Sequence, residues 1–315
     1  MLKIGLVGTW HVHFQGYARE VSSREDCKIV ALWDPSEEAG KKFAAQFNCE
    51  YVADYDAFLA REDVEAIMVC SSTDLHKELM VKAAKAGKHI FTEKVLCFNE
   101  KDALEVKEAI KKSGVKFCIS FPWRSRGDFL YIKDAIDIGL VGKVNYIRMR
   151  NAHNGAGADW LPKTFYDKKS CGGGAMMDLG AHSMYLLNWF LGRPQKAASA
   201  FTNVIVNSVE DNAVSVLTYE GGVIGVSETA FVAPNNPFEL EVVGDKGTIL
   251  AGGMFDRLCY NIGDGWVYPR LPQGKPSPLN MWVDGILNGT EIPYTIEDAV
   301  DLSYTMELAY NNVIE

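Results

Sequence analysis

The chain has 315 residues, of which 48% are hydrophobic and 23% charged, and its formal net charge at pH 7 is −9. This length predicts two domains, and the acidic balance without a basic run excludes an electrostatic nucleic-acid surface. Seven cysteines are scattered without a CxxC pair, which indicates a reducing compartment rather than a disulfide framework or a zinc site. No apolar run is long enough to span a bilayer and Met1 leads directly into a strand pattern, so we expect a cytoplasmic protein.

The first predicted element is a buried parallel strand over residues 2–7, which ends at Gly8 and passes through a short turn into a helix. A strand, a glycine turn and a helix form the first unit of a dinucleotide-binding fold, because the helix N-terminus attracts a pyrophosphate. Gly5 and Gly8 fit the glycine fingerprint of that fold, whereas Trp10 and His13 stand where later glycines are expected. The glycine motif alone is therefore weak.

The second predicted strand, over residues 28–33, ends at Asp34. An acidic residue at this position can accept hydrogen bonds from both ribose hydroxyls of NAD, and it would repel the 2′-phosphate of NADP. No arginine follows Asp34 directly, so the sequence favours NAD. The same residue opens an Asp-Pro-Ser-Glu-Glu run that is typical of a helix N-terminus, and the two interpretations are compatible.

Strand and helix patterns alternate as far as Ser120, which predicts a parallel sheet with ligands at the carboxyl ends of its strands. Beyond Ser120 the chain changes to long β-rich runs separated by hairpin turns, with helices returning only near the end. We therefore predict an α/β protein in two parts. Residues 1–120 form a Rossmann dinucleotide-binding domain, and residues 121–315 form an α+β domain with a large, mostly antiparallel open sheet.

The stretch from Cys171 to Gly192 joins three successive glycines to a helical run in which Asp178 and His182 are four residues apart. On a helix such a pair shares one face, and a fixed carboxylate and imidazole suit proton transfer near neutral pH. The alternative is a buried helix whose Asp and His satisfy each other. Tyr185 and Trp189 continue the polar face, and the expected core face consists of Met176, Leu179, Leu187 and Phe190.

Several features spread over both halves match one known family, namely the Gly5–His11 turn, Asp34, the Ser71–His76 segment, Glu93-Lys94, Arg124 and the GGGxxxDxGxH run from Gly172 to His182. With these features the chain resembles the Gfo/Idh/MocA oxidoreductase family over essentially the full length. The resemblance implies an N-terminal domain that binds NAD(P), a second domain that binds the substrate and whose sheet builds a homodimer or homotetramer, and substrates such as sugars, inositols or related polyols. It thus implies hydride transfer between such a hydroxyl, or its ketone, and a nicotinamide.

Family roles fall on Lys94, Asp178 and His182 as the catalytic group, which with Trp160 would also contact the substrate. In the expected mechanism His182 accepts the hydroxyl proton, Lys94 hydrogen-bonds the reacting oxygen and Asp178 orients the imidazole or binds a neighbouring hydroxyl. Lys94 and His182 could exchange the role of base. The residues expected to hold the cofactor are Gly8, Thr9, Trp10, His11, Asp34, Ser71, Ser72, Thr73, His76, Glu93, Lys94 and Arg124.

The sequence departs from the family at Val95, which replaces a proline, and in its glycine-poor first turn. A non-redox member of the same fold, either an NAD-using hydrolase that cleaves glycosides or a cofactor-binding regulator, is an alternative. A remote alternative is a metal-dependent amidohydrolase, because His11-x-His13 after a first strand resembles a zinc-ligand pair. That alternative requires an eight-fold βα barrel, which the β-rich second half contradicts, and we predict no metal site.

Overall fold

A computed structural model describes residues 1–235 and 237–314, which form two compact units. The first unit consists of residues 1–120 and 276–300, and the second of residues 121–275 and 301–315. The chain leaves the first unit after Ser120, at the expected place. The segment 276–300 returns to it, however, so the expected continuous second domain over 121–315 is interrupted.

The first unit is built on a six-stranded sheet in the order β3-β2-β1-β4-β5-β6, and every neighbouring pair is parallel. This confirms the Rossmann prediction. Helices cover both faces of such a sheet, which is why all four residues of β4 are buried apolar side chains. The strands are β1 (Leu2–Val7), β2 (Cys27–Trp33), β3 (Glu50–Tyr51), β4 (Ala66–Val69), β5 (His89–Thr92) and β6 (Phe117–Ile119).

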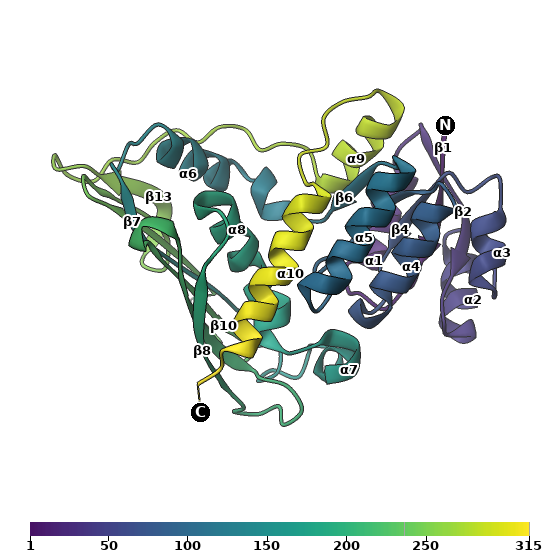
Figure 1. The fold of residues 1–315 in the computed structure, drawn as a ribbon, viewed down its shortest axis with the longest axis horizontal. Helices are drawn as coiled ribbons and strands as arrows, with labels where there is room; N and C mark the ends of the chain where they lie inside the picture. The colour runs from purple at the N-terminus through teal and green to yellow at the C-terminus, as the bar shows by residue number, and fades with distance from the viewer. Residues whose placement is uncertain (236, 315) are drawn as a thin grey trace. The chain divides into compact units, whose positions relative to one another are not determined.

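The helices of the first unit follow the strands in alternation, and α4 and α5 lie side by side (Figure 1). Three of them begin at a side chain that accepts a backbone N–H of the first turn, namely Ser36, Asp54 and Asn99. Such caps satisfy donors that a helix leaves open at its start. These helices are α1 (Phe14–Ser22), α2 (Glu37–Gln46), α3 (Tyr55–Ala60), α4 (Thr73–Lys85) and α5 (Glu100–Ser113).

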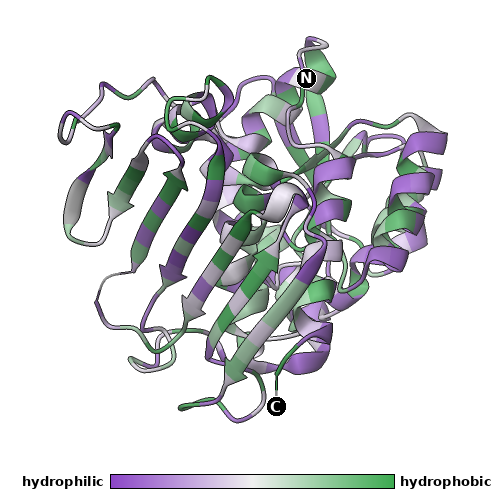
Figure 2. Ribbon diagram, turned by 60° about the vertical axis from the view of Figure 1, so that its left-hand side comes forward, coloured by the Kyte–Doolittle hydropathy of each residue, from purple (hydrophilic) through white to green (hydrophobic). Residues whose placement is uncertain are grey.

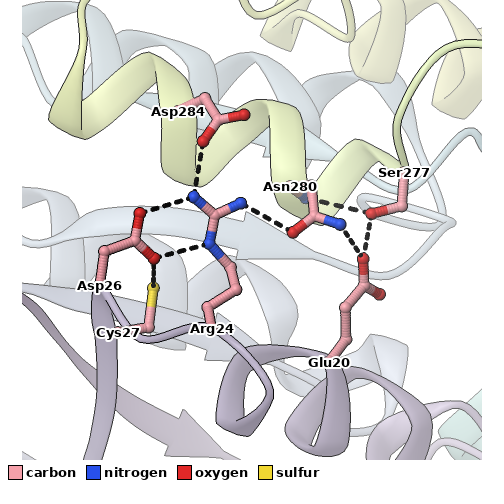
Figure 3. A network of polar contacts seen from close by, with 7 residues as sticks. All are labelled: Glu20, Arg24, Asp26, Cys27, Ser277, Asn280 and Asp284. Carbon is pink, nitrogen blue, oxygen red and sulfur yellow. Dashed lines mark hydrogen bonds and ion pairs between the residues drawn. The ribbon is translucent and has the colours of Figure 1, made fainter.

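The returning segment is fixed to the first unit by apolar packing and by a polar network (Figure 3). Trp282 of α9 (Pro278–Leu287) is fully buried, and its ring lies 5.8 Å from that of Phe91 on β5. Arg24 donates to Asn280 at 2.9 Å and to Asp284 at 2.6 Å. These partners are more than 250 residues away from Arg24 in the sequence, so no local pattern could assign α9 to this unit.

The second unit is built on a seven-stranded sheet in the order β13-β12-β11-β7-β10-β9-β8, in which only β7 and β10 pair in parallel. The prediction of a mostly antiparallel sheet is confirmed. Hydrophilic and hydrophobic residues alternate along these strands (Figure 2). The strands are β7 (Val144–Ala152), β8 (Lys196–Thr202), β9 (Asn212–Thr218), β10 (Ile224–Ala230), β11 (Phe238–Gly244), β12 (Thr248–Gly252) and β13 (Phe255–Asn261).

The two faces of this sheet differ in their cover. Helix α8 (Ala181–Leu191) packs on β7 and β10, whereas the opposite face exposes Val214 and Val216 of β9 by 38% each. Among the other apolar residues of these β-rich runs, Val204 is exposed, whereas Val206, Val226 and Phe231 are buried. The remaining elements are η1 (Pro122–Ser125), α6 (Gly127–Asp137), η2 (Lys163–Tyr166), α7 (Lys168–Cys171), η3 (Met176–Gly180), η4 (Glu220–Gly222) and α10 (Ile296–Asn311).

Within residues 1–235 and 237–314, no helix combines the length and the apolarity needed to cross a membrane.

Candidate functional site

The turn after β1 approaches the residue that follows β4 very closely. Gly8 has a φ of +79°, and a Cβ atom on it would lie 2.5 Å from the Cα of Ser71. Both the backbone conformation and the space therefore require glycine. Ser71 is buried and Ser72 is the N-cap of α4, whose first residue is Thr73. These residues thus lie at the carboxyl edge of the parallel sheet, where the fold places its ligands.

Asp34 follows β2 at the same edge and is 5% exposed. Its Oδ2 accepts hydrogen bonds from the Thr9 amide and from the Thr9 hydroxyl, each at 2.7 Å, and its Oδ1 accepts the Ser36 amide at 2.7 Å. A carboxylate oxygen can accept about two hydrogen bonds, so Oδ2 is filled and Oδ1 keeps one place. The residues fit a dinucleotide ribose at Asp34, with one acceptor place for a hydroxyl.

Glu93, directly after β5, is the acceptor at the centre of the first turn. It is 1% exposed, and its Oε1 lies 2.8 Å from Nδ1 of His13 and accepts the Tyr17 hydroxyl hydrogen bond. Its Oε2 accepts the Lys94 amide at 3.0 Å. Burial by itself would raise the pKa of Glu93, but the nearby His11, His13 and Lys94 hold that pKa well below its usual range. The Glu93 carboxylate thus holds the turn in place through hydrogen bonds and is not directed to a ligand.

Three of these side chains also form the one group with metal-ligand spacing that the described part of the chain contains. The ligand atoms of His11, His13 and Glu93 all lie within 4.8 Å of one another. Nδ1 of His11 accepts the His13 amide at 3.2 Å, and Nδ1 of His13 already faces Glu93. A metal ion would have to replace both contacts. The Rossmann sheet is not an amidohydrolase barrel, so the fold rules out that alternative.

His76 joins the end of β4 to the turn that contains Lys94. It is 1% exposed, its Nδ1 lies 3.0 Å from the Val95 carbonyl, and its Nε2 lies 3.2 Å from the Ser71 carbonyl. Burial lowers the pKa of His76, although these carbonyls oppose the effect. The peptide bond between Lys94 and Val95 is cis. The expected cofactor role of His76 is therefore a structural one in this arrangement, because its ring contacts the backbone.

In the second unit, the glycine run before the candidate catalytic helix is fixed by Glu210. The Glu210 Oε1 accepts the amides of Gly174 at 2.8 Å and Met176 at 3.1 Å, and the Tyr310 hydroxyl at 2.6 Å. A Cβ atom on Gly173 would overlap the Tyr310 hydroxyl, and one on Gly174 would overlap the Glu210 carbonyl oxygen. The glycines are therefore needed for this close approach rather than for a free ligand-binding N-terminus.

The predicted single helix over this stretch is in fact a π turn, η3, followed by α8. Asp178 lies in η3 and His182 in the first turn of α8, which is buried from Ala181 to Leu187. The predicted core face is buried at Met176, Leu187 and Phe190. The expected polar face is not exposed, because His182 and Tyr185 are buried and Asp178 and Trp189 are half-buried. Leu179, expected in the core, is half-buried, and its backbone carbonyl accepts a hydrogen bond from the side-chain amide of Asn151 at 2.9 Å.

His182 is 8% exposed and lies between two aromatic residues. Its ring centroid is 4.8 Å from that of Trp123, with 23° between the planes, and its Nδ1 lies 3.1 Å from the Tyr185 hydroxyl. Arg124, beside Trp123, has its guanidinium 5.0 Å from the Trp189 ring. Trp160 is 57% exposed and its ring lies 4.6 Å from that of His153, so it is open to a ligand.

Most of the predicted residues form two groups, one at the strand ends of the first unit and one around α8 in the second, whereas Trp160 lies in the loop after β7 beside His153. The predicted residues differ in their exposure to solvent. Thr9 and Trp10 are partly exposed and Trp160 is well exposed, whereas His11, Glu93 and Lys94 are at most 6% exposed. Sequence reasoning did not identify the side chains that hold the site residues in place. They are Tyr17, Trp123, Glu210 and Tyr310.

Comparison with known proteins decides the family. Residues 2–121 match the oxidoreductase family with an NAD-binding Rossmann fold, and residues 129–250 match the GFO/IDH/MocA C-terminal domain. The chain belongs to the GFO/IDH/MocA oxidoreductase family. This confirms the resemblance inferred from the Glu93-Lys94 pair and the Gly172–His182 run, and it makes the protein a member of an NAD(P)-binding family.

Individual relatives of known name share only limited sequence identity with this chain. It is 25% identical to inositol 2-dehydrogenase of Rhizobium meliloti over 330 residues, spanning 100% of this chain and 97% of that protein. It is 33% identical to 2,7-anhydro-N-acetylneuraminate hydratase of Mediterraneibacter gnavus over 150 residues, 48% of this chain and 39% of that protein. A levoglucosan dehydrogenase in complex with NADH and levoglucosan superposes with a TM-score of 0.85 at 17% identity, covering 99% and 96%. That structural likeness supports the fold alone.

Proposed function

We propose that the protein is an NAD-dependent dehydrogenase that oxidises a hydroxyl group of a sugar, inositol or related polyol, or reduces the matching ketone. The observation that supports this most is the buried setting of His182, whose imidazole is fixed on α8 beside Trp123 in a family of NAD-binding oxidoreductases. The similarity to an inositol dehydrogenase over the whole chain favours the same substrate class.

In this proposal the strand ends of the first unit hold the cofactor and the residues around α8 hold the substrate. A bound nicotinamide would supply the hydride chemistry, and Asp34, whose Oδ1 already accepts the Ser36 amide, would accept a ribose hydroxyl at the same oxygen. Lys94 hydrogen-bonds the reacting oxygen, because an ammonium or amine at that atom stabilises developing negative charge. Asp178 and His182 bind the hydroxyls of the polyol, and Trp160 offers an exposed aromatic face to the sugar ring.

Assay against a panel of polyols with NAD tests the proposal. Lys94→Ala and His182→Ala are each expected to lower turnover by about 10²–10⁴, the range for a lost acid–base or oxyanion group, with His182→Ala leaving NAD affinity much less affected. Lys112→Ala on the exposed end of α5 is the control and should retain full activity. Near-normal rates for both site variants on an established substrate would sink the assignment.

Cofactor preference is a separate test. In this proposal Asp34 faces the position that the 2′-phosphate of NADP would occupy. A carboxylate that faces a phosphate without a compensating cation costs on the order of 1–3 kcal/mol of binding free energy. NAD should therefore bind at least about tenfold more tightly than NADP. Fluorescence quenching of the tryptophans on titration with each dinucleotide measures this ratio. Equal affinities for the two dinucleotides would refute the preference for NAD and would leave the assignment of the fold unchanged.

We also propose that two copies pair through the open face of the seven-stranded sheet, as a homodimer or as half of a homotetramer. Val214, Val216 and Ile224 are each 38% exposed there, on the neighbouring strands β9 and β10. Identical apolar faces are buried by closed two-fold pairing. Val216→Glu should dissociate the assembly in light scattering, whereas Leu104→Glu on α5 should not. A wild-type mass of one chain, 34.9 kDa, would contradict the pairing.

A non-redox reaction is the second candidate, and the 33% identity to a hydratase over 150 residues is the observation that favours it. Such an enzyme would add or remove water with no net change in the nicotinamide. Absorbance of NADH and mass spectrometry of the product, followed in one reaction, separate the two candidates. A product that differs from the substrate by water, formed without net NADH, would favour the hydratase.

A further inference from the structure

Charged side chains occupy the centre of the open sheet face of the second unit. Arg148 and Arg150 lie two residues apart on β7, the middle strand of the sheet, so both point to the same side. The strand register places Arg150 opposite Glu228 of β10 and Glu239 of β11, and it places Glu228 opposite Val214 of β9. Val214 is exposed on the open face, so these charged residues share that face. Their side chains are half-buried.

The two arginines differ in their partners. The Arg148 Nη1 lies 3.4 Å from Glu228 and 3.3 Å from Glu239, and its Nε lies 3.8 Å from Glu241 of β11. The Arg150 side chain makes no hydrogen bond or ion pair with any residue of 1–235 or 237–314. At 3.8 Å the contact with Glu241 is too long for a hydrogen bond, so this carboxylate has room for a further cation. One face thus presents both an unpaired cation and an incompletely paired carboxylate.

A protein surface that covers this face removes water from Arg150. Taking a charge out of water is strongly unfavourable unless a counter-charge and hydrogen bonds replace the water. A purely apolar or a basic surface would leave the guanidinium unpaired, so the covering surface has to supply a carboxylate. In two-fold pairing that surface is the same face of a second copy, which brings the partner's Glu241. The face is therefore complementary in charge to itself.

We propose that Arg150 forms an ion pair with Glu241 of the partner subunit, and that this pair selects a second copy of the chain as the occupant of the open face. Two-fold symmetry makes the contact occur twice, since Arg150 of each copy meets the carboxylate of the other. The planar guanidinium suits such a contact, because it can donate two parallel hydrogen bonds to one carboxylate. The inference rests on the proposed pairing of the sheets and adds the side chains that fix how the two faces meet.

Exchange of the two charges between separate chains tests the contact. Arg150→Glu and Glu241→Arg should each be monomeric in light scattering at micromolar concentration, because either homodimer would bring like charges together twice. An equimolar mixture of the two variants should return to the wild-type mass, since both contacts of a mixed pair again join a cation to a carboxylate. Within its own chain each substitution has the same surroundings alone and in the mixture. Recovery on mixing can therefore come only from a contact between chains.

Lys112→Glu on α5 makes the same change of charge away from the sheet and should keep the wild-type mass. Arg150→Gln covers the case in which Arg150→Glu does not fold, because it adds no charge beside Glu228 and Glu239. It should raise the dissociation constant of the pair at least about tenfold. A mixture that stays monomeric, or Arg150→Gln that pairs as tightly as wild type, would overturn the contact and leave the pairing of the sheets intact. A wild-type mass of one chain would instead overturn the pairing, and the contact with it.

Discussion

The turn after β1 and the turn before η3 both lead the chain into a helix beside a candidate site, and a buried glutamate fixes each of them. Glu93 accepts from His13, from Tyr17 and from one backbone amide. Glu210 accepts from two backbone amides and from Tyr310. The turn with three glycines is thus bound through its backbone, and the glycine-poor turn through its side chains. The comparison shows that a missing glycine fingerprint need not mean a loose turn.

The largest effect is expected where the glycine turn is closest to its glutamate. In Gly174→Ala the new methyl would overlap the Glu210 carbonyl, and a forced backbone shift of this kind costs about 3 kcal/mol or more of unfolding free energy. Gly16→Ala in α1 is the matched control, because no atom outside its own helix lies within 4 Å of the added methyl. Urea unfolding should find Gly16→Ala at least as stable as wild type. Equal midpoints for the two variants would contradict the close approach.

Removing the acceptor itself comes next. Glu210→Ala leaves the backbone amides of Gly174 and Met176 and the Tyr310 hydroxyl without their acceptor. The expected loss of unfolding free energy is about 2–4 kcal/mol. Glu210→Gln keeps a carbonyl oxygen in place and should recover much of that loss. Thermal unfolding of the pair gives the measurement. If the alanine and glutamine variants were equally unstable, charge rather than hydrogen bonding would be the main contribution of Glu210.

How far the sequence predicts this site depends on which contacts are local. Periodicity and turn residues suffice for the parallel sheet, for Asp34 at the end of β2 and for the helix that contains His182. They do not suffice for α9 or for Glu210, because the partners of these elements lie 36 to about 260 residues away along the chain. The π turn at Met176–Gly180 also escaped prediction, since its apolar pattern fits an α-helix equally well.

The glycine-poor turn allows a test by pH. Glu93→Gln keeps the shape but removes the charge that binds His13 and Tyr17, and the expected loss at pH 7 is about 1–3 kcal/mol. Since the pKa of Glu93 is lowered in the folded state, the stability that it contributes is present above about pH 4.3 and is lost as the pH falls through the folded pKa. The difference between wild type and Glu93→Gln should therefore shrink below about pH 4. A difference that grew on acidification would contradict this sign.

The two phenols allow the most direct comparison of the turns. Tyr17 donates to Glu93 and Tyr310 to Glu210, and burial together with the glutamate raises the pKa of each phenol, so both retain their hydrogen. Each change to phenylalanine should cost about 1.5–3 kcal/mol, the range for a hydrogen bond to a charged group. Tyr219→Phe, which removes a buried hydroxyl without a partner among the described residues, should cost nothing.

Between the two, Tyr17→Phe should be the more damaging. The Tyr17 oxygen also lies 2.7 Å from the Ser120 hydroxyl, which is 1% exposed and would lose that contact in the variant. Glu210 accepts hydrogen bonds from Tyr310 and from two backbone amides, and the amides still hold its carboxylate in place in Tyr310→Phe. Paired urea titrations measure the difference. A larger loss for Tyr310→Phe would mean that the backbone amides alone do not fix Glu210, and that the glycine turn depends on side chains as much as the first turn does.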